Sequence, residues 1–260
     1  MTVTPSDALN TALYKLTGYR LTQAAPHALT DTGVGVPWLR SYLYLADLLD
    51  GAPDGGAIVE CGVATGGTLA MLVDLSQLRR VAMGRDGNVY GFDSWAGHMP
   101  SPTVADFDGS GDNKASWYEP PKGGKEAVLA NLKNWGYESR HVTLVQGWFE
   151  DTMDQLPDRI SFLHIDADLY ESYRTVLRAA TPKLVPGAII ALDEYERPKE
   201  WPGARRAVDE WLAENPEGYE ITQHPHGKFY ITCGRELVPG DVPEDASERA
   251  GLTRLPSGAG

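Results

Sequence analysis

Short apolar segments, each ending at a glycine or an acidic residue, alternate along this chain with segments of helical periodicity. The apolar segments are residues 57–61, 88–92, 141–147, 160–166 and 187–193. The helical segments are residues 37–49, 68–80, 124–134, 171–184 and 203–215. Apolar runs of this length are typical of buried strands. Because strands that alternate with helices favour a parallel sheet with right-handed crossovers, the chain is predicted to form an α/β fold.

The end of the chain breaks this alternation. The apolar runs 219–224 and 228–234 are separated only by the tripeptide PHG, which is the spacing of an antiparallel β-hairpin. A parallel sheet that finishes in such a hairpin is the layout of the class I methyltransferase fold, whereas a nicotinamide-binding domain usually stays parallel. We therefore predict a Rossmann-like three-layer sandwich around a seven-stranded, mostly parallel sheet.

The composition limits the partners and the compartment. The formal net charge of the 260 residues is −13, so most of the surface would repel nucleic acid and anionic membranes. Cys61 and Cys233 lie in separate apolar runs, which offers neither a disulfide framework nor a zinc motif. The start of the chain lacks a signal peptide, and no apolar stretch is long enough to span a bilayer. These features predict a soluble, cytoplasmic protein.

The predicted methyltransferase domain covers residues 37–238, with a long insertion at about residues 94–124. Residues 1–36 are expected to be an N-terminal loop or helical segment that could act as a lid, and residues 239–260 a flexible tail. The insertion is rich in Gly, Pro and Asp and has no periodicity, a composition found in lids and in disordered loops.

The stretch VECGVATGGT joins the first strand to the next helix. Glu60 ends the strand, Gly62 begins the turn and Thr68 opens the helix. Glycines let a ligand approach the backbone, and the helix N-terminus offers N–H groups to an anion. The spacing differs from the dinucleotide motif, and an acid here would repel pyrophosphate but hold an ammonium. S-adenosylmethionine carries both an ammonium and a carboxylate; the alternative is a tight turn without a ligand.

The residues that follow the second and third strands also support a site for S-adenosylmethionine. Asp93 follows the second strand, where an acid commonly accepts hydrogen bonds from a ribose diol. Trp148 and Phe149 follow the third strand, where an aromatic ring could stack on adenine. The alternatives are a turn or helix cap for Asp93 and ordinary hydrophobic packing for the two aromatic side chains.

Acidic residues also follow the fourth and fifth strands. Asp166 ends one, and Asp193 and Glu194 end the other, so all three are expected at one edge of the sheet. Unpaired carboxylates in a partly dry crevice repel each other unless a cation is present, and oxygen ligands favour Mg²⁺. Such an ion would lower the pKa of a substrate hydroxyl. The alternative is that these acids cap helices or are solvated; Asp168 is expected to orient the metal site or cap the following helix.

The stretches VYGFDSWAG, QGWFEDT, HIDADLYES and PGAIIALDEY, in this order, resemble the macrocin O-methyltransferase-like (TylF-type) family over about residues 36–234. The resemblance implies an enzyme that uses S-adenosylmethionine and Mg²⁺ to methylate a hydroxyl, often of a deoxysugar, on a secondary metabolite such as an antibiotic. It implies metal ligands at Asp166, Asp193 and Glu194. The catalytic base is expected to be Asp166 or a residue of one of the loops. The family commonly has a second aspartate where this chain has Glu194.

The resemblance also implies a set of cofactor contacts. These are Glu60, Gly62, Ala64, Thr68, Asp93, Ser94, Gly147, Trp148, Phe149 and Asp166. On the acceptor side, the sequence suggests polar and aromatic residues of the N-terminal loop and of the insertion. These are His27, Asp31, His98, Asp106, Asp108, Trp117 and Tyr118.

The acceptor is predicted to be a small glycosylated molecule, and the enzyme a homo-oligomer. An acceptor of the phenol or catechol type is the alternative, although Leu169 stands where catechol enzymes usually have a lysine base. A non-catalytic protein that binds S-adenosylmethionine is a further alternative, which the three acids disfavour.

Overall fold

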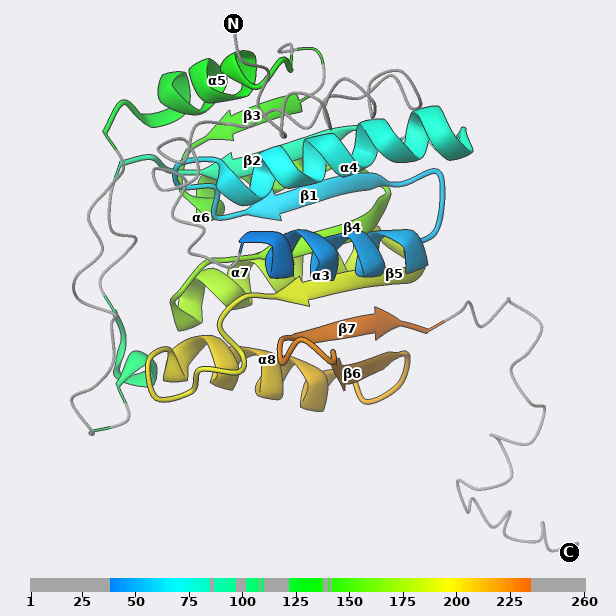
Figure 1. The fold of residues 1–260 in the computed structure, drawn as a ribbon. Helices are drawn as coiled ribbons and strands as arrows, with labels where there is room; N and C mark the ends of the chain where they lie inside the picture. The colour runs from blue at the N-terminus through cyan, green and yellow to red at the C-terminus, as the bar shows by residue number, and fades with distance from the viewer. Residues whose placement is uncertain are drawn as a thin grey trace, which may run out of the picture.

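The computed structural model describes residues 38–84, 87–96, 102–107, 109, 122–137, 140 and 142–234. Within these residues, a seven-stranded sheet has the strand order β3-β2-β1-β4-β5-β7-β6 (Figure 1). Strands β1 to β5 are parallel, and β7 runs antiparallel to both of its neighbours. The predicted α/β fold with a C-terminal antiparallel hairpin is therefore confirmed.

The elements follow the predicted segments closely. The strands are β1 (Ala57–Cys61), β2 (Val89–Asp93), β3 (Val142–Gln146), β4 (Ile160–Ile165), β5 (Leu184–Leu192), β6 (Tyr219–Gln223) and β7 (Phe229–Cys233). The helices are α3 (Trp38–Gly51), α4 (Gly67–Met83), α5 (Gly124–Asn134), α6 (Phe149–Thr152), α7 (Tyr170–Ala180) and α8 (Pro202–Glu214). Short 3-10 turns are η1 (Val104–Asp106), η3 (Met153–Gln155) and η4 (Thr181–Lys183).

The largest difference between a predicted and an observed boundary is at the end of α7. Helix α7 ends at Ala180 rather than at Leu184, and the strand that follows begins at Leu184. The residues between them form η4, which contains Pro182. Because proline lacks the amide N–H that would continue the α-helical hydrogen bonds, the α-helix stops there.

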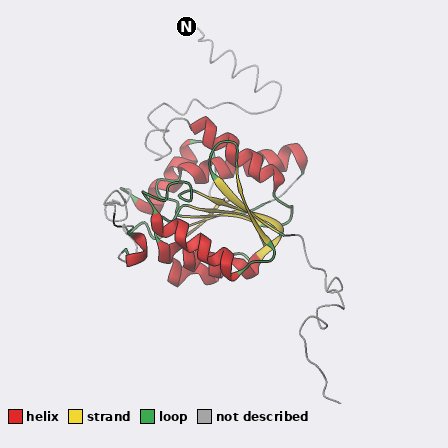
Figure 2. Cartoon of the chain, turned by 90° about the horizontal axis from the view of Figure 1, so that it is seen from below, coloured by secondary structure: helices red, strands yellow, loops and turns green. Residues whose placement is uncertain are grey.

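Two helical layers cover the sheet. Helices α3, α4 and α5 contribute to the core on one face, and α6, α7 and α8 to the core on the other (Figure 2). Every residue of β1 and β4 is buried, since both strands lie in the middle of this sandwich. None of the described helices has the length and apolar character needed to cross a bilayer.

The ladder of parallel strands continues into the loops at their carboxyl ends. The amide of Asp166 donates to the carbonyl of Cys61 at 2.9 Å, and the amide of Asp193 donates to the carbonyl of Ile165 at 3.0 Å. These bonds hold the residues that follow β1, β4 and β5 at one edge of the sheet, where open α/β sheets bind ligands.

Backbone strain gathers at the same edge. Among the described residues other than glycine, Ala64, Trp95 and Asp168 have a positive φ, of 47°, 46° and 59°. They lie in the loops that follow β1, β2 and β4. A left-handed conformation is unfavourable for a residue with a Cβ and persists only where its surroundings enforce it. The three loops are therefore held in place by contacts of this edge.

Gly62 makes the closest of these contacts possible. Its φ is +91°, and a Cβ at this position would lie 1.7 Å from the carbonyl oxygen of Asp166. Gly62, which the sequence predicts to contact the cofactor, therefore also has a structural role. Because it has no Cβ, the loop after β1 can pack against the end of β4.

We expect Gly62→Ala to destabilise the protein by about 3 kcal/mol or more, because the added methyl group meets backbone that cannot move without breaking the sheet. Gly218 is the matched control, since its φ is +92° and a Cβ there would meet nothing within 4 Å. Gly218→Ala should cost only about 1–2 kcal/mol, the strain of the left-handed backbone. Urea unfolding of both variants measures the difference, and equal losses would rule out the close approach.

Candidate active site

Glu60 is buried at the end of β1 with one oxygen unpartnered. Glu60 is 1% exposed, and its Oε1 lies 3.2 Å from Nδ1 of His164 on the neighbouring strand β4. Its Oε2 is buried and has no hydrogen-bond partner among the described residues. Burial, assisted by the charges of Asp166 and Asp93, raises the pKa of Glu60 well above its usual range. A buried carboxylate of this kind is suited to pairing with a cationic group.

Asp93 ties the loop after β2 to the glycine turn. Its Oδ2 accepts hydrogen bonds from the amides of Val63 and Ala64, both at 2.8 Å, and its Oδ1 accepts one from the amide of Trp95 at 2.7 Å. The predicted ribose contact would have to use the remaining lone pair of this carboxylate. Trp95 strengthens the link, because its indole N–H donates to the carbonyl of Ala64 at 2.9 Å.

The two predicted adenine contacts lie in different environments. Phe149 is 8% exposed and packs in the hydrophobic core with Met153, so core packing accounts for most of its surface. Trp148 is half-buried at the start of α6. The other predicted cofactor residues, Thr68, Ser94 and Gly147, are half-buried in the loops and helix starts at the same edge.

Three carboxylates gather where β4 and β5 end. Asp166, Asp168 and Glu194 each offer an oxygen, and these oxygens lie within 4.8 Å of one another. We call this group the acidic cluster. Asp166 and Asp168 are half-buried, and Glu194 is fully buried. Two of the three predicted metal ligands are thus brought together, and Asp168 joins them in place of Asp193.

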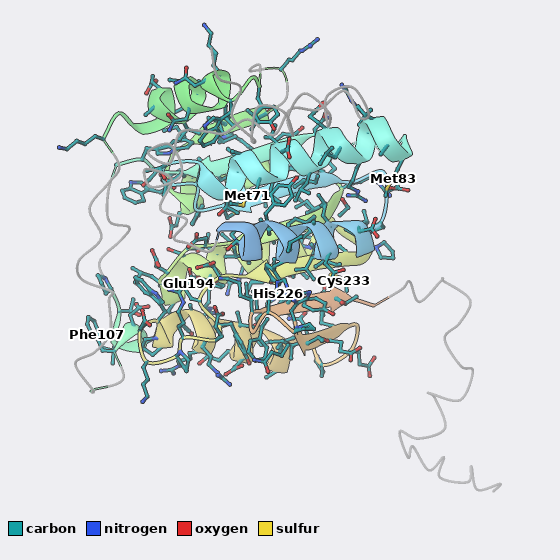
Figure 3. All side chains as sticks on the ribbon, in the orientation of Figure 1. Met71, Met83, Phe107, Glu194, His226 and Cys233 are labelled. Carbon is teal, nitrogen blue, oxygen red and sulfur yellow. The ribbon has the colours of Figure 1, made fainter. Side chains whose placement is uncertain are left out.

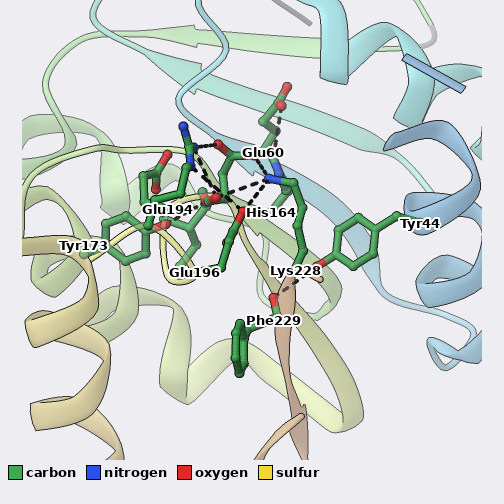
Figure 4. A network of polar contacts seen from close by, with 11 residues as sticks. Tyr44, Glu60, His164, Tyr173, Glu194, Glu196, Lys228 and Phe229 are labelled. Carbon is green, nitrogen blue, oxygen red and sulfur yellow. Dashed lines mark hydrogen bonds and ion pairs between the residues drawn. The ribbon is translucent and has the colours of Figure 1, made fainter. Parts of the chain in front are cut away.

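Tyr173 orients the buried member of the acidic cluster. Its hydroxyl reaches Glu194 Oε2 from α7 and also lies 3.0 Å from the carbonyl oxygen of Ile165 (Figure 4). The other oxygen of this carboxylate, Oε1, is buried and has no hydrogen-bond partner among the described residues. An unpartnered buried oxygen beside two further carboxylates is unfavourable unless a cation is present.

Asp193 has different partners. Its Oδ1 accepts a hydrogen bond from Lys228 at the start of β7, and its Oδ2 accepts one from Arg197 at 2.6 Å (Figure 4 shows Lys228 reaching into the network). Burial would raise the pKa of Asp193, but Lys228, His164 and Arg197 hold it at about 2. Successive residues at a strand end point to opposite sides, which explains why Asp193 and Glu194 face different neighbours.

Sequence reasoning missed Lys228 as a partner because it lies 35 residues away, in the hairpin. It also underrated Asp168, although the spacing Asp-x-Asp after β4 was visible. The predicted acceptor residues His27, Asp31, His98, Asp108, Trp117 and Tyr118 lie outside the described residues.

The acidic cluster cannot be fully ionised without a counter-charge. Burial, with the charge of Asp193, raises the pKa of Asp166 to about 7. Burial and neighbouring carboxylates raise the pKa values of Asp168 and Glu194 well above their usual range. Groups with such shifts at the edge of an α/β sheet are typical of functional sites.

Comparison with known proteins identifies the family. The sequence matches the macrocin-O-methyltransferase (TylF) family over residues 46–222. The chain belongs to this family. The fold, the acids at the strand ends and the predicted O-methyltransferase class agree with the membership.

Two relatives from Streptomyces have described acceptors. Demethyldecarbamoylnovobiocin O-methyltransferase of Streptomyces niveus is 29% identical over 190 residues, which cover 72% of this chain and 69% of the relative. The 8-demethyl-8-(2,3-dimethoxy-alpha-L-rhamnosyl)-tetracenomycin-C 4'-O-methyltransferase of Streptomyces olivaceus is 30% identical over 180 residues, which cover 65% of this chain and 64% of the relative.

Solved structures share the fold of this macrocin O-methyltransferase family member. The O-methyltransferase NovP superposes with a TM-score of 0.61 and is 26% identical, covering 76% of this chain and 81% of its own. The calicheamicin methyltransferase CalS11 superposes with a TM-score of 0.58 at 23% identity, covering 89% of this chain and 94% of its own. The class I methyltransferase fold predicted from the sequence is confirmed.

The raised pKa values predict how stability depends on pH. An acid whose pKa is higher in the folded than in the unfolded state stabilises the fold when protonated, and this contribution is lost as the pH rises. In the presence of EDTA, the free energy of unfolding should therefore fall by about 1–3 kcal/mol between about pH 5 and about pH 8. Asp193 does not offset this, because its pKa of about 2 lies below the window. Burial lowers the pKa of His164 to about 4, so His164 opposes the fall only up to about pH 6.5, where the unfolded imidazole titrates.

Asp166→Asn should reduce the change of the unfolding free energy with pH, since one titrating group is removed. The control Asp158→Asn, at an exposed position, should leave this change as it is in the wild type. Urea unfolding at several pH values measures the slope. A wild-type stability that rises over this range would contradict the assignment of raised pKa values to the acidic cluster.

Proposed function

We propose that this enzyme transfers a methyl group from S-adenosylmethionine to a hydroxyl of a sugar on a glycosylated natural product, with Mg²⁺ held by the acidic cluster. The observation that carries the proposal is the acidic cluster itself. It includes a buried Glu194 oxygen without a partner and stands at the ligand-binding edge of a macrocin O-methyltransferase family member.

The loop after β1 supports S-adenosylmethionine as the methyl donor. Glu60 has a buried carboxyl oxygen without a partner at the end of β1, and the ammonium of the methionyl group would pair with the ionised form of this carboxyl. Helix α4 begins at Gly67 directly after the turn, and its free N–H groups suit the methionyl carboxylate. A pyrophosphate would meet the charge of Glu60, which disfavours a dinucleotide. Family membership implies the same donor.

The acidic cluster fits a hard divalent cation. Its members offer only oxygen ligands, which Mg²⁺ prefers, and no histidine or cysteine that would favour zinc. When bound, such an ion lowers the pKa of the acceptor hydroxyl and orients its oxygen. Asp193 is already neutralised by Lys228 and Arg197, so we propose Asp166, Asp168 and Glu194 as the ligand set.

The chain itself can take up the proton that leaves the acceptor hydroxyl. Asp166 and Asp168 are half-buried and can be reached from the edge of the sheet, whereas Glu194 is closed off by Tyr173 and the core. A carboxylate oxygen that is not committed to the cation can accept this proton. We therefore assign this role to one of the two aspartates. Leu169 is 2% exposed and offers no base, which disfavours a catechol-type mechanism.

The names of the relatives suggest the acceptor class. The Streptomyces olivaceus enzyme is named for a rhamnosyl-tetracenomycin and the Streptomyces niveus enzyme for a novobiocin precursor. We therefore propose a glycosylated secondary metabolite as the acceptor of this enzyme.

The direct test incubates the enzyme with S-adenosylmethionine and a panel of glycosylated secondary metabolites, with either Mg²⁺ or EDTA. Mass spectrometry should detect products heavier by one methylene group only in the samples with Mg²⁺. The matched panel of aglycones should give no product. Equal turnover in EDTA would exclude the metal, and methylation of the aglycones alone would favour the phenol-type alternative.

Tyr173→Phe tests the metal site separately from activity. Loss of the hydroxyl that holds Glu194 should weaken Mn²⁺ binding, measured by electron paramagnetic resonance, by roughly 10-fold. Tyr195→Phe is the matched control, because the hydroxyl of Tyr195 donates to Asp209 on α8 at 2.6 Å and does not touch the acidic cluster. The metal assignment fails if both variants bind Mn²⁺ as the wild type does.

A further inference from the structure

Asp106 is a buried acid that the proposed chemistry does not use. It belongs to η1, within the insertion between β2 and α5, and is 2% exposed. Its Oδ1 accepts a hydrogen bond from the amide of Tyr170 at 2.7 Å. Its Oδ2 accepts bonds from the amide and the hydroxyl of Thr103, at 2.7 and 3.0 Å. The carboxylate is therefore enclosed by protein donors, which argues against the acceptor contact that the sequence suggested.

The partner of Asp106 is the first residue of α7. The N-cap residue of this helix, Leu169, has no side-chain oxygen with which to accept a hydrogen bond from the first turn. Asp106 fills this place from a position 64 residues away in the sequence. Its negative charge also lies at the positive end of the helix dipole, an arrangement that stabilises a helix.

The loop between β4 and α7 carries two members of the acidic cluster. Its first residue, Asp166, is held by the bond from its amide to the carbonyl of Cys61. Its end is held by the bond from the amide of Tyr170 to Asp106. Between them, Asp168 has a φ of +59°, a strained conformation that needs support from both sides.

We propose that Asp106 is a positioning residue that fixes the loop of Asp166 and Asp168 and so couples the insertion to the acidic cluster. The consequence for metal binding rests on the proposed function, whereas the consequence for the loop itself does not. Both oxygens of Asp106 accept hydrogen bonds from protein groups, and Asp106 acts through the backbone of Tyr170.

Gly203 shows how closely the two segments fit. It lies in the first turn of α8, and a Cβ there would come within 2.0 Å of Asp106 Oδ1 and 3.0 Å of the Cβ of Tyr170. Glycine is otherwise unfavourable in a helix relative to alanine. Its presence is accounted for by the space that the carboxylate of Asp106 occupies.

The position of η1 places part of the insertion next to the loop that carries Asp166 and Asp168. The insertion leaves β2 on one side of β1, but η1 packs against α7 and α8, which follow β4 and β5 on the other side. Figure 3 shows Phe107, directly after η1, at the same end of the molecule as Glu194, with Met83 at the opposite end. A displacement of η1 is thus transmitted to the loop that carries Asp168.

The test compares Asp106→Ala with Asp158→Ala, which removes an exposed acid of the same charge from the loop before β4. Hydrogen exchange of the peptide that spans residues 166–173 should be faster by about 10-fold or more in the first variant alone. Mn²⁺ binding should weaken by roughly 10-fold, while S-adenosylmethionine binding by calorimetry changes less than about twofold.

Gly203→Ala supplies an independent perturbation, because it displaces the carboxylate without removing it. This variant should show the same faster exchange and weaker Mn²⁺ binding. In the Asp106→Ala background, the same change should cost less stability than in the wild type, since the colliding oxygen is gone and only the Cβ of Tyr170, at 3.0 Å, remains close. This non-additivity distinguishes a specific contact from general damage to the fold.

Two results would overturn the inference. One is unchanged exchange of residues 166–173 in Asp106→Ala, and the other is full additivity of the two substitutions. A wild-type enzyme that does not bind Mn²⁺ would instead refute the proposed metal, and the exchange measurement would still decide whether Asp106 holds the loop.

Discussion

The close approach of the loop after β1 to the end of β4 is the contact on which the rest of the site depends. Gly62 lies against the carbonyl of Asp166, and the amide of Asp166 donates to the carbonyl of Cys61. The first loop carries the residues suited to the methyl donor, and the second carries two members of the acidic cluster, Asp166 and Asp168. Because methyl transfer requires the two reactants to be held in line and in contact, a shared backbone contact between their binding loops is an effective way to fix their separation.

Compensation of charge is the second constraint on this edge of the sheet. Two acids outside the acidic cluster have dedicated partners: Lys228 and Arg197 for Asp193, and the start of α7 for Asp106. The acidic cluster, like Glu60, has no cation among the described residues in direct contact with it, and burial and the neighbouring carboxylates raise the pKa values of its members. The acidic cluster destabilises the protein without a cation but suits a divalent ion. Such unfavourable charge is expected at a site that serves ligand binding rather than folding stability.

Much of the fold could be predicted from the sequence. The predicted and observed bounds of β1 coincide, and those of most other elements differ by one or two residues, because hydrophobic periodicity reports directly on burial. The site was predicted in part. Asp166 and Glu194 were expected together, and they are, but Asp193 pairs with Lys228, and Phe149 packs in the core. Position at a strand end shows that a residue lies at the edge, but not which way its side chain turns.

The sequence by itself determined the order of strands and helices, the edge at which the acids collect and the family to which the enzyme belongs. These properties follow from local patterns and from short motifs read along the chain. Only the tertiary structure decided which acids form the acidic cluster, which are neutralised and which support the backbone. Those roles depend on partners from distant segments: Lys228 of the hairpin for Asp193, Tyr173 of α7 for Glu194, and Tyr170 for Asp106. Such pairs form only when the sheet brings the segments together, so no local pattern encodes them.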